Sequence, residues 1–504
     1  MKQLLCVFAI LSFAVASSQA QTDLIAQIHF LGGNKIFADT NHLGFTNEFC
    51  STEARALESQ TLDKLSAAPA TWFKSKLPSH AIDCSKQLRP LLDDFLKSEW
   101  IFEMRDATNG SPEYALAIRL DNQRAQLWNT NLRALIESWT TIRAQDTSDG
   151  WRLKKDLPPN LFQFSRRGDW VILDCGQNKL PLGDEILDPF LKTRIASVET
   201  NWLTANVDWP RLARLYPVFG KFDFPKFAFQ AVGDAGCFYI TGLLNLSQPL
   251  PLLEKWQVPT NEITQPFDSF TAARGFGPWL ERQNWFQPFK LQPQPNQFYV
   301  WALPGFPLIT YAAEPVPDAN DAMARLDQHL ATDLVWQSQF MTPLHESIAG
   351  NKTLFTGVPF ISPYVLADRE SSGDFLSGGF LPGPAGSGLL PPPLMAILNA
   401  PGLVYYHWED TRARLIALPE LGQLLCLLTK HQQLQVGSAA QKWLKKIQPT
   451  QGATATAATE IAPDEITFVR TGPDGYTAME LVVLAHWLDG SNFPSLVIPK
   501  VQDQ

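Results

Sequence analysis

Alternation of apolar and polar residues marks a series of short strands separated by turns and helices. Trp100–Arg105 and Tyr114–Leu120 flank an Asn-Gly-Ser-Pro turn, which is the pattern of a hairpin. A helix with one apolar face is predicted next, from Asp121 to about Arg143. Leu161–Ser165 and Trp170–Asp174 then form another hairpin pattern. The predicted unit is therefore strand, strand, helix, strand, strand.

The same order returns further along the chain. Two strands, a helix and a second hairpin are predicted again, at Phe298–Ala302, Leu308–Ala312, Asp318–Leu334, Thr353–Thr356 and Tyr364–Ala367.

A second kind of unit, a strand, a helix and a hairpin, is also predicted twice. Its first copy comprises Asn201–Val207, Asp208–Leu215, Lys226–Ala231 and Gly236–Thr241. Its second copy comprises Leu403–Trp408, a helix reaching about Leu428, and the strands Glu465–Arg470 and Tyr476–Ala485, with Asp474-Gly475 as the turn between them.

These repeats predict an α+β protein of duplicated antiparallel sheets with helices packed on them, preceded by an N-terminal helical segment. The predicted divisions are a signal peptide (1–20), the helical segment (21–95), the first copy (96–285), a Pro/Gln-rich linker (286–297), the second copy (298–490) and a C-terminal tail (491–504).

Two further segments have the composition of long loops. Ser377–Pro393 is rich in glycine and proline, and Pro449–Thr459 is built mostly from threonine and alanine. Loops of this length in a compact domain are either functional or disordered, and the sequence leaves both readings open.

The N-terminus has the pattern of a secretory signal peptide. Lys2 precedes an apolar run from Leu4 to Ala16, and small residues at Ser18 and Ala20 predict cleavage after Ala20. The alternative is an N-terminal anchor helix, although the run is below the roughly 20 residues that cross a bilayer. We therefore expect an exported protein, periplasmic or extracellular, whose mature chain is soluble. Its formal charge of −9 argues against a nucleic-acid partner.

Export would place the cysteines in an oxidising compartment. Cys50 and Cys84 are the nearest pair in the mature sequence, and we predict a disulfide between them. Closing that loop would stabilise the fold by about 3–4 kcal/mol. Cys175, Cys237 and Cys426 are predicted to be buried thiols.

Known catalytic and cofactor motifs are absent from the sequence. It has no GxxxxGK[ST], GxGxxG, GxSxG or HExxH pattern, and no cofactor, metal or catalytic residue is assigned. The one acid–base candidate is the cluster of His407, Glu409 and Asp410, since a histidine beside carboxylates can move protons. The alternative is that Asp410 caps a helix and Glu409 is a surface charge.

Several segments resemble uncharacterised secreted proteins of verrucomicrobial bacteria. They are QTLDKLSAAP (Gln60–Pro69), SFTAARGF (Ser269–Phe276), YAAEP (Tyr311–Pro315) and APDEITFVRTGPDGYTAMELVVLAHWL (Ala462–Leu488). More distantly, the strand–helix–hairpin units are similar to tandem α+β envelope proteins of unknown function. The resemblance implies an envelope location and no particular activity.

The sequence thus predicts an exported protein that binds or holds an unknown ligand or envelope protein without catalysis. The alternative is a secreted hydrolase whose active-site residues are dispersed along the chain. A spatial cluster of histidine and carboxylate groups would favour the hydrolase.

Overall fold

The fold is known from a computed structural model. It describes residues 23–39, 43–72, 84–106, 112–155, 161–177, 180–188, 201–281 (without 218, 222, 235, 252, 261–262 and 264–265), 296–305, 309–332, 344–349, 351–356, 362–381 (without 371), 390–418 and 437–494 (without 492). The predicted signal peptide, Cys426 and most of the predicted linker and tail lie outside these residues.

All strands of the described residues belong to one large antiparallel sheet. The prediction of duplicated sheets is therefore wrong. Alternation of side chains shows where strands lie, but which strands become neighbours depends on backbone hydrogen bonds that the alternation does not encode. The chain itself divides into two compact units, Met1–Asn245 with His486–Ile498 (unit 1) and Leu246–Ala485 with Pro499–Gln504 (unit 2).

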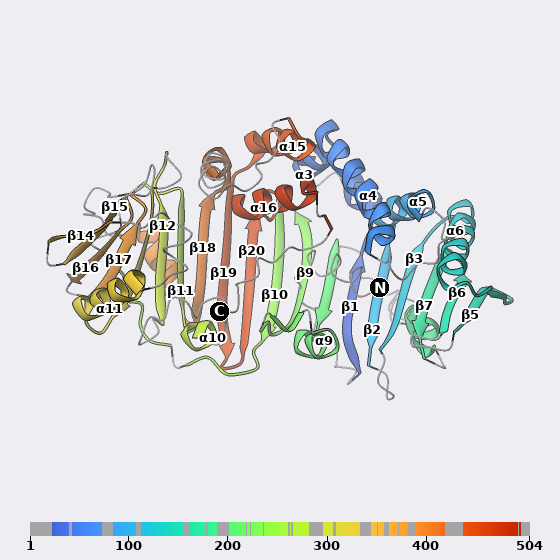
Figure 1. Ribbon diagram of the computed structural model, residues 1–504, viewed down its shortest axis with the longest axis horizontal. Helices are drawn as coiled ribbons and strands as arrows, with labels where there is room; N and C mark the ends of the chain where they lie inside the picture. Colours follow the sequence, from blue (N-terminus) through green and yellow to red (C-terminus); the bar gives the residue numbers. More distant parts are fainter. Residues whose placement is uncertain are drawn as a thin grey trace. The chain divides into compact units, whose positions relative to one another are not determined.

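Unit 1 contributes a run of antiparallel strands to this sheet (Figure 1). Their order is β4 (Gln145–Asp146), β5 (Gly150–Lys154), β6 (Leu161–Arg167), β7 (Trp170–Gly176), β3 (Glu113–Arg119), β2 (Trp100–Arg105), β1 (Leu24–Phe30), β8 (Leu203–Val207), β9 (Lys226–Asp234) and β10 (Cys237–Asn245).

The segment predicted to be wholly helical before residue 96 in fact begins with β1. This strand lies between β2 and β8, so it belongs to the interior of the sheet and not to a helical segment. Its sequence, LIAQIHF, is only seven residues long, and the longer pattern that follows it is helical. The described helices of unit 1 are α2 (Gly33–Ala38), α3 (Leu43–Phe49), α4 (Thr52–Trp72), α5 (Cys84–Lys97), α6 (Asn122–Thr140), α7 (Pro181–Glu185) and α9 (Trp209–Leu215), with a 3-10 turn at Phe219–Lys221.

Side-chain caps begin several of these helices as the sequence suggests. The Asp121 carboxylate accepts a hydrogen bond from the N–H of Arg124 and starts α6, and Asp208 accepts from Arg211 and starts α9. Figure 1 shows α5 and α9 at opposite ends of the unit 1 strands. The face of the sheet that carries Ile101, Ala117 and Ile172 packs against α7.

Unit 2 contributes the strands β20 (Glu465–Gly472), β19 (Ala453–Ala462), β18 (Leu403–Asp410), β11 (Ser269–Arg274), β12 (Gln297–Ala302), β13 (Thr310–Val316), β17 (Gly373–Gly379), β16 (Tyr364–Glu370), β15 (Lys352–Thr356) and β14 (Leu344–Ala349), in that order. Read from β10 to β4, the strands of unit 1 follow the same order as those of unit 2. Each strand of unit 2 thus corresponds to the unit 1 strand whose number is ten lower, for example β18 to β8 and β11 to β1. The strand predicted to open each copy, at Trp100 and Phe298, is the second strand of its unit.

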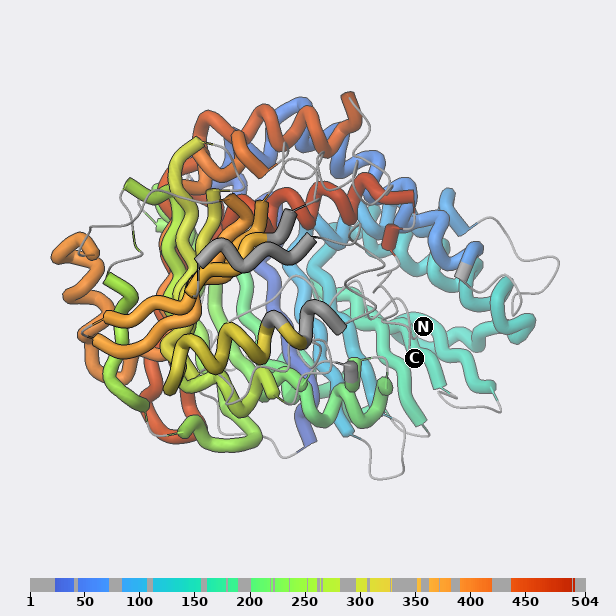
Figure 2. Tube along the Cα trace, turned by 60° about the vertical axis from the view of Figure 1, so that its left-hand side comes forward, coloured from blue at the N-terminus to red at the C-terminus, as the bar shows by residue number. Residues whose placement is uncertain are grey.

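The helices of unit 2 cover both faces of its strands. In Figure 2, α11 runs beside β16 and β17, and Ala319, Ala322 and Met323 of α11 pack on Ala367 and Leu376. The described helices are α10 (Gly277–Glu281), α11 (Ala319–Thr332), α13 (Pro392–Leu398), residues 411–418, α15 (Ala439–Ile447), a 3-10 turn at Gln448–Thr450, and α16 (Ala478–Asp489).

Residues 476–485, which we predicted to be a strand, instead lead into and form α16. Its buried residues Ala478, Leu481, Val482 and Ala485 are spaced three and four apart, which is the spacing of one helix face. Thr477 and Glu480 make a capping box, in which the Thr477 N–H donates to Glu480 and the Glu480 N–H donates to Thr477 Oγ1. The apolar run fits a period of two as well as a helical period, whereas the capping box marks the start of a helix.

The hairpin partner of β20 is therefore β19, which lies mostly in the segment predicted to be a loop. Thr456 and Ala458 of this Thr/Ala segment face Arg470 and Phe468 across the ladder. The turn of the hairpin is at Pro463-Asp464, between the end of β19 at Ala462 and the start of β20 at Glu465, and not at Asp474-Gly475. Threonine is favoured in strands, so the low complexity of the segment did not exclude one.

The capping box gives a stability prediction. We expect Thr477→Ala to lower the free energy of unfolding by about 1 kcal/mol, because the N–H of Glu480 loses its acceptor. Thr52→Ala is the matched control, since Thr52 is exposed and Ser51 already accepts from the N–H of Ala54. Denaturant titration of both variants measures the effect, and equal stability of the two variants would contradict the role of the cap.

Candidate functional site

The acid–base candidates lie at the C-terminal end of β18, in the interior of unit 2. β18 pairs with β11 on one side and β19 on the other, and His407 lies opposite Thr271 and Thr456. Because residues two apart in a strand point to the same face, His407 and Glu409 share a face and Asp410 points to the other. Only His407 and Glu409 can therefore act together.

Asp410 has the capping role proposed as the alternative to catalysis. Its Oδ1 accepts a hydrogen bond of 3.0 Å from the N–H of Ala413, at the start of the helix 411–418. Burial and repulsion from Asp410 raise the pKa of the neighbouring Asp268 carboxyl, while Arg414 lowers it.

Both ring nitrogens of His407 face protein atoms. Nδ1 lies 2.8 Å from Thr271 Oγ1, a hydrogen-bond distance. Nε2 lies 3.6 Å from Glu409 Oε2, is buried, and has no hydrogen-bond partner among the described atoms. A substrate atom approaching from solvent would meet neither nitrogen without a rearrangement of the site.

Glu409 is not the surface charge considered in the sequence: its exposed fraction is 4%. Its Oε1 accepts a 2.6 Å hydrogen bond from the N–H of Ala478, the first residue of α16, and lies 3.0 Å from the hydroxyl of Thr411. Burial by itself would raise the pKa of this carboxyl, but His407 and the Ala478 N–H outweigh it and hold the pKa below its usual value. Glu409 is thus a buried anion at the positive end of a helix.

A larger cluster of ionisable groups lies in unit 1, where the sequence had indicated no site. Glu103 and Arg105 of β2, Glu113 of β3 and Asp174 of β7 are all buried on the face that α7 covers. Arg105 contacts Glu103 at 3.1 Å and Glu185 of α7 at 2.5 Å. The available signal was a charged residue at an inward position of otherwise apolar strands, as in WIFEMR and WVILDCG.

The first turn of α7 is bound by two of these carboxyls. Glu113 Oε1 accepts from the N–H of Leu182, and Asp174 Oδ2 accepts from the N–H of Gly183, each at 2.7 Å. Burial raises the pKa of Glu113 to about 7. Burial, with repulsion from Glu113, raises the pKa of Asp174 to about 8. Carboxyls with such pKa values can exchange protons near neutral pH.

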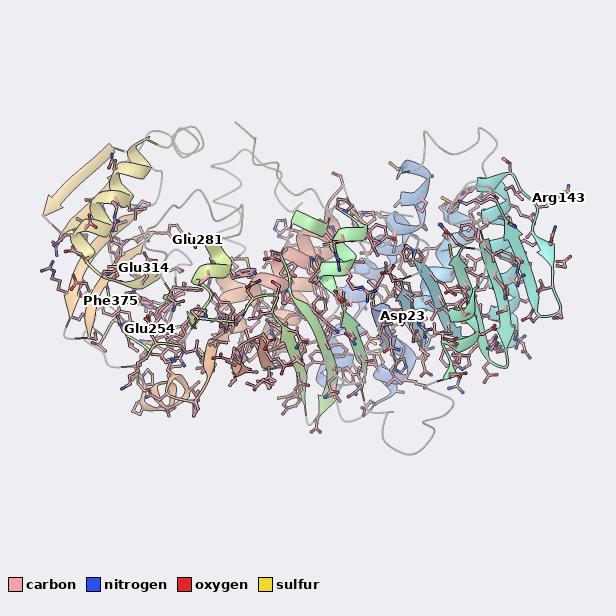
Figure 3. All side chains as sticks on the ribbon, turned by 90° about the horizontal axis from the view of Figure 1, so that it is seen from below. Asp23, Arg143, Glu254, Glu281, Glu314 and Phe375 are labelled. Atoms are coloured by element: carbon pink, nitrogen blue, oxygen red, sulfur yellow. The ribbon has the colours of Figure 1, made fainter. Side chains whose placement is uncertain are left out.

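One further carboxyl with a raised pKa lies in unit 2. Glu314 of β13, labelled with Phe375 in Figure 3, faces Leu376 across the ladder to β17. Burial raises its pKa to about 7. It shares the sheet face of His407, but β11 and β12 lie between its strand and β18, so it is not part of the same site.

Neither a metal centre nor a membrane span is found in the part of the chain that the structure describes. There, no group of three or more histidine, cysteine, aspartate or glutamate residues is arranged to hold a metal ion. Within the same residues, no helix is both long and apolar enough to cross a bilayer.

The predicted bond between Cys50 and Cys84 is not present, because neither cysteine is part of a disulfide. Cys84 is buried at the start of α5, and its Sγ lies 3.6 Å from the carbonyl oxygen of Ser66 in α4. Cys84 therefore contacts α4, against which α5 packs, and is not bonded to Cys50. Of the three cysteines predicted to be buried, Cys175 is, Cys237 is partly exposed, and Cys426 lies outside the described residues.

Comparisons of the chain with protein-family models, curated proteins and solved structures gave no match. The resemblance to secreted verrucomicrobial proteins therefore stays a prediction, and function is argued from the geometry of the two clusters.

The contact between Glu409 and α16 gives a second prediction. We expect Glu409→Gln to lower the free energy of unfolding at pH 7 by about 1–3 kcal/mol, because a charge-assisted hydrogen bond becomes a neutral one. Asp464→Asn, in the exposed turn between β19 and β20, is the control and should change stability by less than about 0.5 kcal/mol. A stabilised Glu409→Gln variant would contradict a structural role.

Proposed function

We propose that this chain is an exported, non-catalytic protein of the cell envelope that binds or holds a partner. The proposal that the protein is non-catalytic depends on one observation: the buried carboxyls bind helices. Glu113, Asp174 and Glu409 each accept a hydrogen bond from the N-terminal turn of a helix that lies on the sheet. Groups that would be acid–base candidates thereby have a structural role. Export is supported by the signal-peptide pattern of residues 1–20.

One observation favours the hydrolase as a second candidate. Thr271, His407 and Glu409 stand in the order of a nucleophile, a base and a group that orients the base. The 2.8 Å distance from Thr271 Oγ1 to His407 Nδ1 suits proton transfer. The 3.6 Å distance from His407 Nε2 to Glu409 is longer than a hydrogen bond, and Glu409 already binds the N–H of Ala478.

The substitution Thr271→Val separates the two candidates, because valine keeps the shape of threonine and removes its hydroxyl. If the site is structural, the melting temperature falls, since His407 Nδ1 loses its hydrogen-bond partner. Purified residues 21–504 should then show no turnover of nitrophenyl esters, glycosides, phosphates or a labelled protein that depends on Thr271.

Thr471→Val, on β20 and away from His407, is the control for removing a threonine hydroxyl from a strand. Loss of a measured hydrolysis in Thr271→Val but not in Thr471→Val, with the melting temperature unchanged or raised, would overturn the non-catalytic proposal. Residues that serve activity often reduce stability, so a raised melting temperature would indicate a catalytic site.

Export is tested by expressing the chain with and without residues 1–20 in a Gram-negative host. We expect the full chain in the periplasmic fraction with an N-terminus at Gln21, and the truncated chain inside the cell. An uncleaved protein in the membrane fraction would instead support the anchor helix, and cytoplasmic retention of the full chain would contradict export.

A further inference from the structure

The helix α7 is a short cover over apolar residues of the unit 1 sheet. Leu182 of α7 and Ile186, the residue that follows the helix, have no exposed surface and pack on Ile101, Ala117 and Ile172. Five residues are too few to form a stable helix without tertiary contacts. Movement of α7 away from the sheet would therefore both unfold it and expose these apolar side chains to water.

Polar contacts at its first turn hold α7 in place. Leu182 N–H donates to Glu113 and Gly183 N–H donates to Asp174, each at 2.7 Å. A Cβ on residue 183 would lie 2.2 Å from Asp174 Oδ2, so only glycine allows this approach. The two carboxyls come from neighbouring strands, β3 and β7, and converge on adjacent amides.

The cations near these carboxyls are already paired with other acids. Arg105 binds Glu103 and Glu185, and Arg167 of β6 binds Asp184 of α7. Arg105 attracts Glu113, whereas Glu185 and Asp184 repel it. Asp174 is repelled by Glu113 and Asp184. The described groups facing the first turn therefore include more carboxyls than cations.

We propose that the docking of α7 on the unit 1 sheet is a pH-sensitive latch, closed while Glu113 and Asp174 carry protons and loosened when they ionise. The helix amides favour the charged carboxyls, but burial and mutual repulsion oppose charge more strongly, and the pKa values of about 7 and 8 give the net direction.

The direction of the pH dependence follows from proton linkage. With α7 undocked and the carboxyls in water, their pKa values return to about 4. The docked form therefore binds more protons than the undocked form between about pH 4 and pH 8. Docking is most stable below that window, weakens as the pH rises through it, and reaches its minimum above pH 8. Each carboxyl can change the equilibrium constant between undocked and docked α7 by up to about tenfold per pH unit.

Hydrogen exchange of the full mature chain, followed by mass spectrometry between pH 5.5 and 7.5, tests the latch. After correction for the intrinsic exchange rate, the protection of the peptide containing residues 182–186 should fall at least tenfold as the pH rises. The peptide containing α9 is the internal control. This helix is capped by Asp208, the residue directly before it, and the protection of α9 should therefore stay constant.

Two variants connect the effect to the carboxyls. Glu113→Gln with Asp174→Asn keeps the acceptor oxygens and should make the protection of α7 independent of pH. Glu113→Gln alone should reduce the pH dependence, which keeps the proposal testable if the double variant fails to fold. Asp169→Asn, at an exposed carboxyl in the turn between β6 and β7, is the control and should leave the pH dependence intact. Constant protection in the parent chain, an equal fall in α9, or an unchanged pH dependence in the double variant would overturn the proposal.

Discussion

A carboxyl group buried against a sheet loses its water, and the fold must either replace those hydrogen bonds or keep the group protonated. Both solutions are present in this chain. The free-energy cost of burying an unpaired charge is several kcal/mol, which exceeds what most single contacts return. Helix amides are suitable replacements, because the first N–H groups of a helix have no partner within the helix. The buried acids therefore determine where the covering helices begin.

The two units use this constraint differently. Glu409 remains an anion, because one helix amide, His407 and Thr411 surround it with groups that favour charge. Glu113 and Asp174 share a buried site with further carboxyls that repel them, so their protonated forms are favoured near neutral pH. The same kind of contact thus gives a fixed fastening of α16 in one case and a proton-dependent contact of α7 in the other.

The sequence predicted local structure better than long-range structure. Hairpins such as the one at Leu161–Asp174, and helices with an Asp cap such as α6, follow from alternation and capping alone. The helix α16 is not predicted by apolar alternation, because the five apolar residues Leu481–Ala485 fit more than one period; the Thr477–Glu480 capping box is the signal that distinguishes the helix. One continuous sheet could not be predicted, since edge pairing leaves no periodic signal.

The candidate sites show the same limit. The sequence found His407 and Glu409 because they are close in the chain, but it assigned Glu409 to the surface because its partner amide lies at residue 478. The cluster around Glu113 and Asp174 was missed because its members come from separate strands, and only their inward positions in apolar strands gave a signal.

The central claim is that these buried acids fasten helices in two protonation states, and unfolding free energies at pH 7 test it most directly. Chemical denaturation of Glu409→Gln, Glu113→Gln and Asp174→Asn should give opposite responses. Our account predicts a loss of stability for Glu409→Gln, where the charge is favourable. It predicts no loss for Glu113→Gln and Asp174→Asn, because the uncharged Gln and Asn side chains resemble the protonated carboxyls that they replace. Losses of similar size in all three variants would contradict it.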